Sequence, residues 1–140
     1  MNNEGPRPRA IEERIEELRT VYHKELRRPM PYEDCRKIMG EPGGRHEDII
    51  PDLDTYTYLI ASCSIGTGKL VARPSDYLRD TRKWLSLTFF EQYPRYADLE
   101  KLITRENTPK LYEELRVYEH ARQLVLELID AVLSSRGRTS

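Results

Sequence analysis

The segment Thr55-Tyr-Thr-Tyr-Leu-Ile-Ala-Ser-Cys-Ser-Ile-Gly-Thr-Gly68 contains no charged side chain. Asp, Glu, Lys and Arg make up 34% of the whole chain, so an uncharged run of this length stands out. Such a run is typical of a buried segment or of a wall that faces a ligand. Asp52 is a suitable N-cap for a helix that begins at Leu53, and two glycines favour its end. We therefore expect a deeply packed central helix around which more hydrophilic helices assemble.

The sequence before this segment predicts two helices. In the first, apolar residues recur three and four positions apart between Glu and Arg, at Ile11, Ile15, Leu18 and Tyr22. Pro29 and Pro31 end it, because proline lacks the amide hydrogen that a helix interior requires. Pro31 then favours a short helix over 32–39, and residues 41–51 are expected to form a loop.

The sequence after the segment predicts three further helices. We expect one from Ser75 or Asp76 to about Gln92, one over 97–103, and a last one that Thr108 and Pro109 open and that reaches about residue 134. No stretch alternates apolar and polar residues as a half-buried strand does. The chain is thus expected to be an all-α single-domain bundle of five to six helices over residues 10–135. Residues 1–9 are expected to be a disordered tail, and residues 136–140 a C-terminal tail.

Composition excludes several classes of function. A net charge of −1 over 140 residues does not favour nucleic acid as a partner, because neutralising phosphates requires a basic surplus. Cys35 and Cys63 are most simply reduced thiols, which predicts a cytoplasmic protein, and the N-terminus lacks the apolar core of a signal peptide. No apolar run is long enough to span a membrane.

The terminal helix is apolar over most of its circumference in its second half. Such a helix is either central to the core or shared with another molecule. Both alternatives stay open here. If it is shared, the partner is another protein or a second copy of the chain, and the candidate interface residues are Leu124, Leu126, Ile129 and Leu133.

Two short motifs resemble known sites but favour simpler interpretations. Gly66-Thr-Gly-Lys69 resembles the end of a phosphate-binding loop, yet Cys63 replaces the required first glycine and Leu70 the magnesium-binding Ser or Thr. It predicts a helix stop. The His46-Glu47-Asp48 cluster offers ligating groups, but adjacent residues rarely converge on one ion. We expect a solvated loop there and no metal site.

Arg116 and His120 lie four residues apart and therefore share a face of the last helix. Helical ribonucleases of the HEPN type place Arg and His on a helix with four to six residues between them, whereas three stand between them here. Packing beside Tyr118 or exposure to water is the simpler interpretation. We therefore predict no catalytic residues and a protein that is not an enzyme, with an RNA-cleaving enzyme as the weakest alternative.

The segment from Pro42 to Leu78 resembles the middle of phycobiliproteins, the globin-like light-harvesting subunits of phycobilisomes. The resemblance is carried by Pro42-Gly43-Gly44, by the run from Asp52 through Leu53-Asp54-Thr55-Tyr56-Thr57-Tyr58-Leu59 to Ile60, by Gly66-Thr67-Gly68 and by Ser75-Asp76-Tyr77-Leu78. Ile49 replaces the cysteine that attaches the bilin, and Pro51 replaces an arginine that pairs with a bilin propionate. Asp52 matches the aspartate that faces the pyrrole nitrogens. The resemblance implies a globin-like fold and a relative that either binds a bilin non-covalently or carries no cofactor.

We therefore expect a non-enzymatic helical binding protein. The resemblance adds a role in phycobilisome assembly, turnover or bilin handling. The candidate ligand-binding residues are Asp52, Tyr56, Arg79 and Arg82. The alternative is a small cytosolic regulatory module that dimerises through its last helix.

Overall fold

The computed structural model describes residues 8–26, 31–39 and 46–139, and these residues form helices and connections without a β-strand. In chain order the elements are α1 (Pro8–Val21), the π-helical η1 (Tyr22–Leu26), α2 (Tyr32–Met39), α3 (His46–Ile65), α4 (Thr67–Leu70), α5 (Ser75–Leu85), α6 (Phe89–Gln92), the 3-10 helix η2 (Pro94–Leu102) and α7 (Pro109–Thr139). The expected all-α single domain is confirmed. Among these described elements, five α-helices have eight residues or more. The globin-like arrangement stays a prediction.

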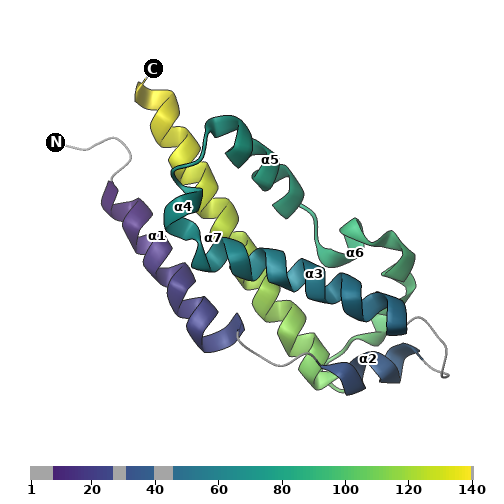
Figure 1. The fold of residues 1–140 in the computed structure, drawn as a ribbon. Helices are drawn as coiled ribbons and strands as arrows, with labels where there is room; N and C mark the ends of the chain where they lie inside the picture. Colours follow the sequence, from purple (N-terminus) through teal and green to yellow (C-terminus); the bar gives the residue numbers. More distant parts are fainter. Residues whose placement is uncertain (1–7, 27–30, 40–45, 140) are drawn as a thin grey trace.

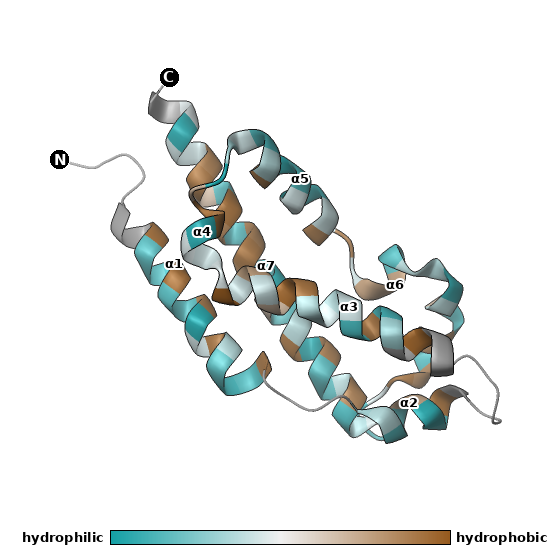
Figure 2. Ribbon diagram, in the orientation of Figure 1, coloured by the Kyte–Doolittle hydropathy of each residue, from teal (hydrophilic) through white to brown (hydrophobic). Residues whose placement is uncertain are grey.

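The 31-residue helix α7 is the central element of the bundle. At 1.5 Å per residue it is about 46 Å long, and α1, α3 and α5 all pack against it (Figure 1). α1 runs antiparallel to α7 along one edge, α3 crosses α7, and α5 covers the opposite edge. Colouring by hydropathy shows apolar residues concentrated on α7 where these three helices cover it (Figure 2).

One hydrophobic core joins these elements. Its largest fully buried side chains come from α1, α3, α5, η2 and α7, and they are Leu18, Ile49, Leu53, Tyr56, Ile60, Leu78, Leu85, Tyr96, Leu111, Val125, Leu128 and Ile129. The stripe on α7 therefore serves the core of a single chain. This finding favours the first of the two alternatives for that helix.

Helix α3 begins at His46, seven residues before the expected start at Leu53. Part of the expected loop over 41–51 is thus helical, residues 41–45 lie outside the described residues, and Asp52 is inside the helix instead of capping it. The reason is burial. Ile49, Leu53, Tyr56 and Ile60 are all buried and lie on one helical face. Packing of Ile49 extends the helix past Pro51, at the cost of one backbone hydrogen bond.

The uncharged segment is helical, as expected, but only one of its faces is deeply packed. Tyr56, Ile60 and Ser64 are buried, whereas Tyr58 and Ile65 are 67% and 51% exposed. The buried hydroxyl of Ser64 donates to the carbonyl oxygen of Ile60 at 3.0 Å, which satisfies it within the helix. Both faces of α3 are therefore uncharged from Thr55 to its end, and the packing of the bundle decides which face is covered.

The helix expected over 75–92 is broken into α5 and α6. Thr88 caps α6: its hydroxyl accepts from the Glu91 amide at 3.3 Å, and its own amide donates to the Glu91 carboxylate at 2.9 Å. This capping box starts a new helix and turns the chain after Leu85. The next helix is a 3-10 helix that begins at Pro94, three residues before the expected position.

The limits of the terminal elements also differ from expectation. α1 begins at Pro8, so the expected tail is helical at 8–9, and residues 1–7 lie outside the described residues. α7 continues through the expected C-terminal tail to Thr139. Arg136 supports this extension, because its guanidinium donates to the Ser75 hydroxyl at 3.0 Å and to the Val71 carbonyl at 2.9 Å. α2 spans Tyr32–Met39, as predicted.

Candidate functional site

A groove opens between α7 on one side and α6 with the end of η2 on the other. It has a volume of about 530 Å³, and its lining residues come from four elements and the connections beside them: Tyr56, Thr88, Phe89, Phe90, Glu100, Ile103, Tyr112, Leu115, Arg116, Glu119, His120 and Gln123. The six residues from α7 are spaced three and four apart and therefore form one face of that helix.

The floor of the groove is aromatic. The buried ring of Tyr56 meets that of Phe89 edge-on, with their centroids 5.4 Å apart, and Phe89 lies parallel to Tyr96 with a centroid distance of 6.0 Å. Burial raises the pKa of the Tyr56 hydroxyl well above its ordinary value, so this residue stays neutral. The floor is thus a neutral apolar surface that excludes charge.

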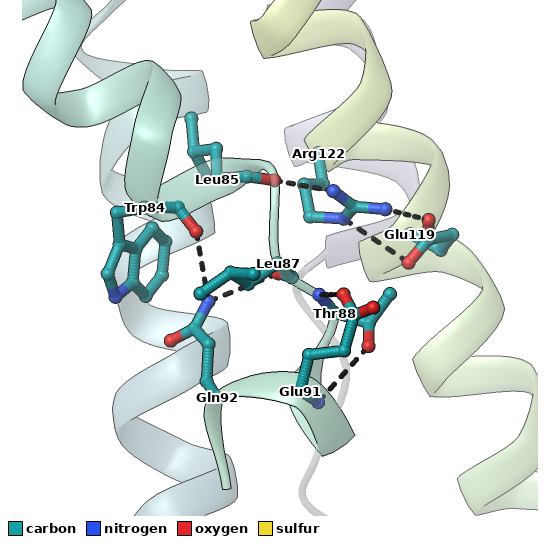
Figure 3. Close-up of polar contacts among 8 residues, drawn as sticks. All are labelled: Trp84, Leu85, Leu87, Thr88, Glu91, Gln92, Glu119 and Arg122. Carbon is teal, nitrogen blue, oxygen red and sulfur yellow. Dashed lines mark hydrogen bonds and ion pairs between the residues drawn. The ribbon is translucent and has the colours of Figure 1, made fainter.

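Polar contacts hold α6 in place as a wall of the groove (Figure 3). Besides the capping box, the Gln92 amide donates to the carbonyl oxygens of Trp84 at 3.3 Å and Leu87 at 3.2 Å, which links α6 back to the end of α5. Phe89 and Phe90 follow directly after the capping residue. The cap therefore sets the position of both rings.

Arg122 joins α7 to the end of α5, behind the groove. Its side chain is 4% exposed, and its guanidinium donates to the Leu85 carbonyl at 2.5 Å and to the Glu119 carboxylate, as Figure 3 shows. The Glu119 side chain is 44% exposed and lines the groove. Because Arg122 neutralises it, Glu119 adds little negative charge to the groove.

The rim of the groove is positively charged at one end. The guanidinium carbons of Arg105 and Arg116 lie 5.4 Å and 6.0 Å from the centre of the Tyr112 ring. Arg116 and His120 are both exposed on the α7 wall, and Glu100 lies on the opposite wall. The two guanidinium groups beside this ring can attract an anionic group, because arginine pairs favourably with carboxylates.

The four predicted ligand-binding residues do not form one site. Only Tyr56 lines the groove. Asp52 accepts hydrogen bonds from Arg95 at 2.6 Å and from the Tyr96 hydroxyl at 2.8 Å. On α5, Arg79 pairs with Asp76 of its own helix at 3.1 Å, and Arg82 pairs with Asp130 of α7 at 2.5 Å.

The predicted interface on α7 is largely occupied within the chain. Leu124 and Ile129 are buried in the core, so these two assignments are wrong. Leu126 and Leu133 are partly buried and pack against the same core. The stripe is apolar, as predicted, and its width reflects the packing of α1, α3 and α5 against α7.

The remaining motifs have structural explanations. In Gly66-Thr-Gly-Lys69, only Gly66 separates α3 from α4, and the other three residues belong to α4. The backbone from His46 to Asp48 is the first turn of α3 instead of a loop. Within residues 8–26, 31–39 and 46–139, no three potential ligands are grouped as a metal ion would need. Arg116 and His120 share the groove rim, as their spacing indicates.

Sequence reasoning missed most of the groove, including Phe89, Phe90, Ile103 and Tyr112. One signal was available, because Thr88-Phe-Phe-Glu91 has the form of a capping box that places two aromatic residues at a helix start. No feature of the nearby sequence indicates that this turn lies opposite α7 across the groove.

The sequence model of the YxiJ-like protein family matches residues 16–126, and the chain belongs to this family. The match extends from α1 to the second half of α7 and includes every residue that lines the groove. No curated protein matches the chain, and no solved structure does. In the described part of the chain, each helix is too short or too polar to cross a membrane.

Proposed function

We propose that this member of the YxiJ-like protein family is a non-enzymatic binding protein whose groove receives an aromatic or aliphatic group that carries a carboxylate. The observation that carries the proposal is the groove between α6 and α7, whose floor consists of the neutral, buried rings of Tyr56 and Phe89. A groove of about 530 Å³ has the size of pockets that bind small ligands or single large side chains.

The positions of the charged residues support the proposal that the ligand carries a carboxylate. An apolar group on the floor places its carboxylate at the rim, within the field of Arg105 and Arg116 around Tyr112. Glu119 does not oppose this, because Arg122 already pairs with it. Two sources supply the same chemistry: a small aromatic acid, and the C-terminal residue of another protein.

A titration followed by amide chemical shifts tests the proposal. The probe is 3-phenylpropionate, and 3-phenylpropionamide is the uncharged control. We expect saturable shifts at residues 88–90 and 112–123 with millimolar affinity, and weaker binding of the amide. Arg116→Gln should weaken binding of the acid about tenfold, the effect of one charge-assisted contact, and leave binding of the amide unchanged.

Arg79→Gln is the matched control, because Arg79 is an exposed arginine on α5 that lines no part of the groove. It should bind the probe as the unmodified protein does. An absence of shifts at the groove, or an equal effect of the two substitutions, would contradict the proposal. Acetyl-Ala-Ala-Phe and its C-terminal amide separate the two sources: tighter binding of the peptide acid than of 3-phenylpropionate indicates a protein terminus.

Binding of a bilin stays a prediction that comes from the resemblance to phycobiliproteins. A linear tetrapyrrole has conjugated rings and propionates, which fit the chemistry of the groove. We do not assign it to Asp52, because Arg95 and Tyr96 already bind that carboxylate. Expression together with bilin synthesis provides the test, since purified protein without visible absorbance would remove this ligand.

A further inference from the structure

Beyond Asp54, the outer face of α3 is largely exposed and carries no charge up to the end of the helix at Ile65. It consists of Thr55, Tyr58, Leu59, Ser62 and Ile65, whose spacings of one, three and four residues place them on one side of the helix. Leu59 is 39% exposed, and Tyr58 and Ile65 are exposed further still. Tyr56 belongs to the opposite face, so this surface is separate from the groove.

Other helices of the chain carry charges on their exposed faces. α1 presents Glu12, Glu16 and Arg19 to solvent, and α5 presents Asp76 and Arg82. Compared with α1 and α5, the solvated face of α3 over residues 55–65, with two apolar residues, one tyrosine and no charge, therefore stands apart. Exposed apolar surface of this kind is typical of a contact site.

We infer that the outer face of α3 is an interface between two copies of this chain, which pack antiparallel about Ser62. The lack of charge restricts the surface that a partner can offer. A charged side chain of the partner that packed on this face would be buried without a counterion. A second copy of the same face meets this requirement. A two-fold axis brings identical patches together, as is usual in homodimers.

The charges at the two ends of the face favour the antiparallel orientation. Asp54 is exposed at its N-terminal end, and Lys69 is exposed just beyond its C-terminal end. Arg19 of α1 adds positive charge at the second end, where its guanidinium lies close to Gly68. In an antiparallel pair the acidic end of each copy meets the basic end of the other, whereas a parallel pair would join like charges.

The order of side chains along the face is also self-complementary about Ser62. Positions at equal distances from this residue come together across the axis, so Leu59 meets Ile65 of the second copy. Tyr58 meets Gly66 of the second copy, where the lack of a side chain leaves room for the ring. Ser62 meets its own equivalent, and a small residue at the crossing point allows two helices to approach closely.

Sedimentation velocity from 1 to 500 µM tests this interface on the full chain. We expect the unmodified protein to dimerise within this range, and Tyr58→Glu and Ile65→Lys to remain monomeric over all of it. Tyr77→Glu is the matched control: Tyr77 is a half-exposed tyrosine on α5, outside the face, and this variant should dimerise normally. Circular dichroism confirms that each variant is folded. A monomeric unmodified protein at 500 µM, or a dimer that both α3 variants retain, overturns the inference.

A charge exchange tests the orientation. Asp54→Lys and Lys69→Glu should each raise the dimer dissociation constant about tenfold, because each creates a like-charge pair twice across the axis. The double variant should restore it, since residue 69 of one copy lies opposite residue 55 of the other in this register, and residue 54 beside it again carries the opposite charge. A double variant that dimerises more weakly than both single variants overturns the antiparallel register. Binding of 3-phenylpropionate is expected to be the same in all of these variants, so this test is independent of the proposed groove.

Discussion

Arg122 offers the most direct test of how the groove wall is held together. The guanidinium is almost fully buried and binds both the Leu85 carbonyl and the Glu119 carboxylate. Arg122→Met replaces the guanidinium with the end of an unbranched apolar side chain. The substitution preserves most of the packing of the stem but removes both polar contacts. Leu85 is buried, so its carbonyl oxygen loses a hydrogen bond that water does not readily replace.

The size of the effect follows from these two contacts. An unsatisfied buried carbonyl costs about 1–3 kcal/mol. The ion pair adds less than about 1 kcal/mol, because Glu119 is exposed enough to regain water. Part of this loss is offset, since methionine avoids the desolvation of a buried guanidinium. We expect a net loss of about 2 kcal/mol in the free energy of unfolding, and a Tm lower by about 6 °C for a chain of this size.

Urea denaturation followed by circular dichroism measures this loss, with two-state behaviour checked by near-ultraviolet signal. Arg116→Met is the matched control, because Arg116 is an exposed arginine on the same helix and its substitution should change stability by less than about 0.5 kcal/mol. If Arg122→Met is no more destabilising than this control, the buried contacts do not hold α5 to α7 and the reasoning is refuted.

Three further predictions concern the core, the thiols and the cap. Leu128→Ala should cost about 2–5 kcal/mol by urea denaturation, because Leu128 is fully buried, whereas Leu126→Ala on the partly exposed side of α7 should cost about 1 kcal/mol; equal losses would contradict the assignment of the core. Burial raises the pKa of the Cys35 thiol to about 12 and that of the Cys63 thiol to about 11. The unfolded thiols ionise near pH 9 and the folded ones do not, so the unfolded state binds fewer protons and stability should fall as pH rises from about 9 to about 11. Urea midpoints measured across this range would show the fall, which Cys63→Ala should reduce, and a flat profile would disprove it. Thr88→Ala removes the capping box and should cost about 1 kcal/mol together with weaker probe binding in the groove, whereas Ser86→Ala, which removes a solvent-exposed hydroxyl, should change neither.

The all-α class and the limits of α2 could be predicted because their signals are local. Proline before Tyr32, helical periodicity in α1 and the Thr108-Pro109 start of α7 act within a few residues along the chain. The groove could not be predicted in the same way. Tyr56, Phe89, Ile103 and Arg116 come from four parts of the chain, and only packing brings them together.

Long-range contacts also decide where helices begin and end. The Leu111 amide in the first turn of α7 donates to the Asp34 carboxylate of α2 at 2.8 Å, although 77 residues separate the two. The start of α3 depends on the burial of Ile49, and the end of α7 on the bonds of Arg136. None of these contacts has a signal in the neighbouring sequence.

The sequence by itself determined the all-α class and that the middle of the chain carries no charge. Only the tertiary structure decided which side of that middle helix is covered and which side faces solvent. The physical reason is that charge and periodicity are properties of one segment, whereas burial depends on how many neighbours pack around it. On α3 the neighbours cover one face, whereas α7 is packed from several sides and keeps a narrower exposed stripe that includes Arg116 and His120.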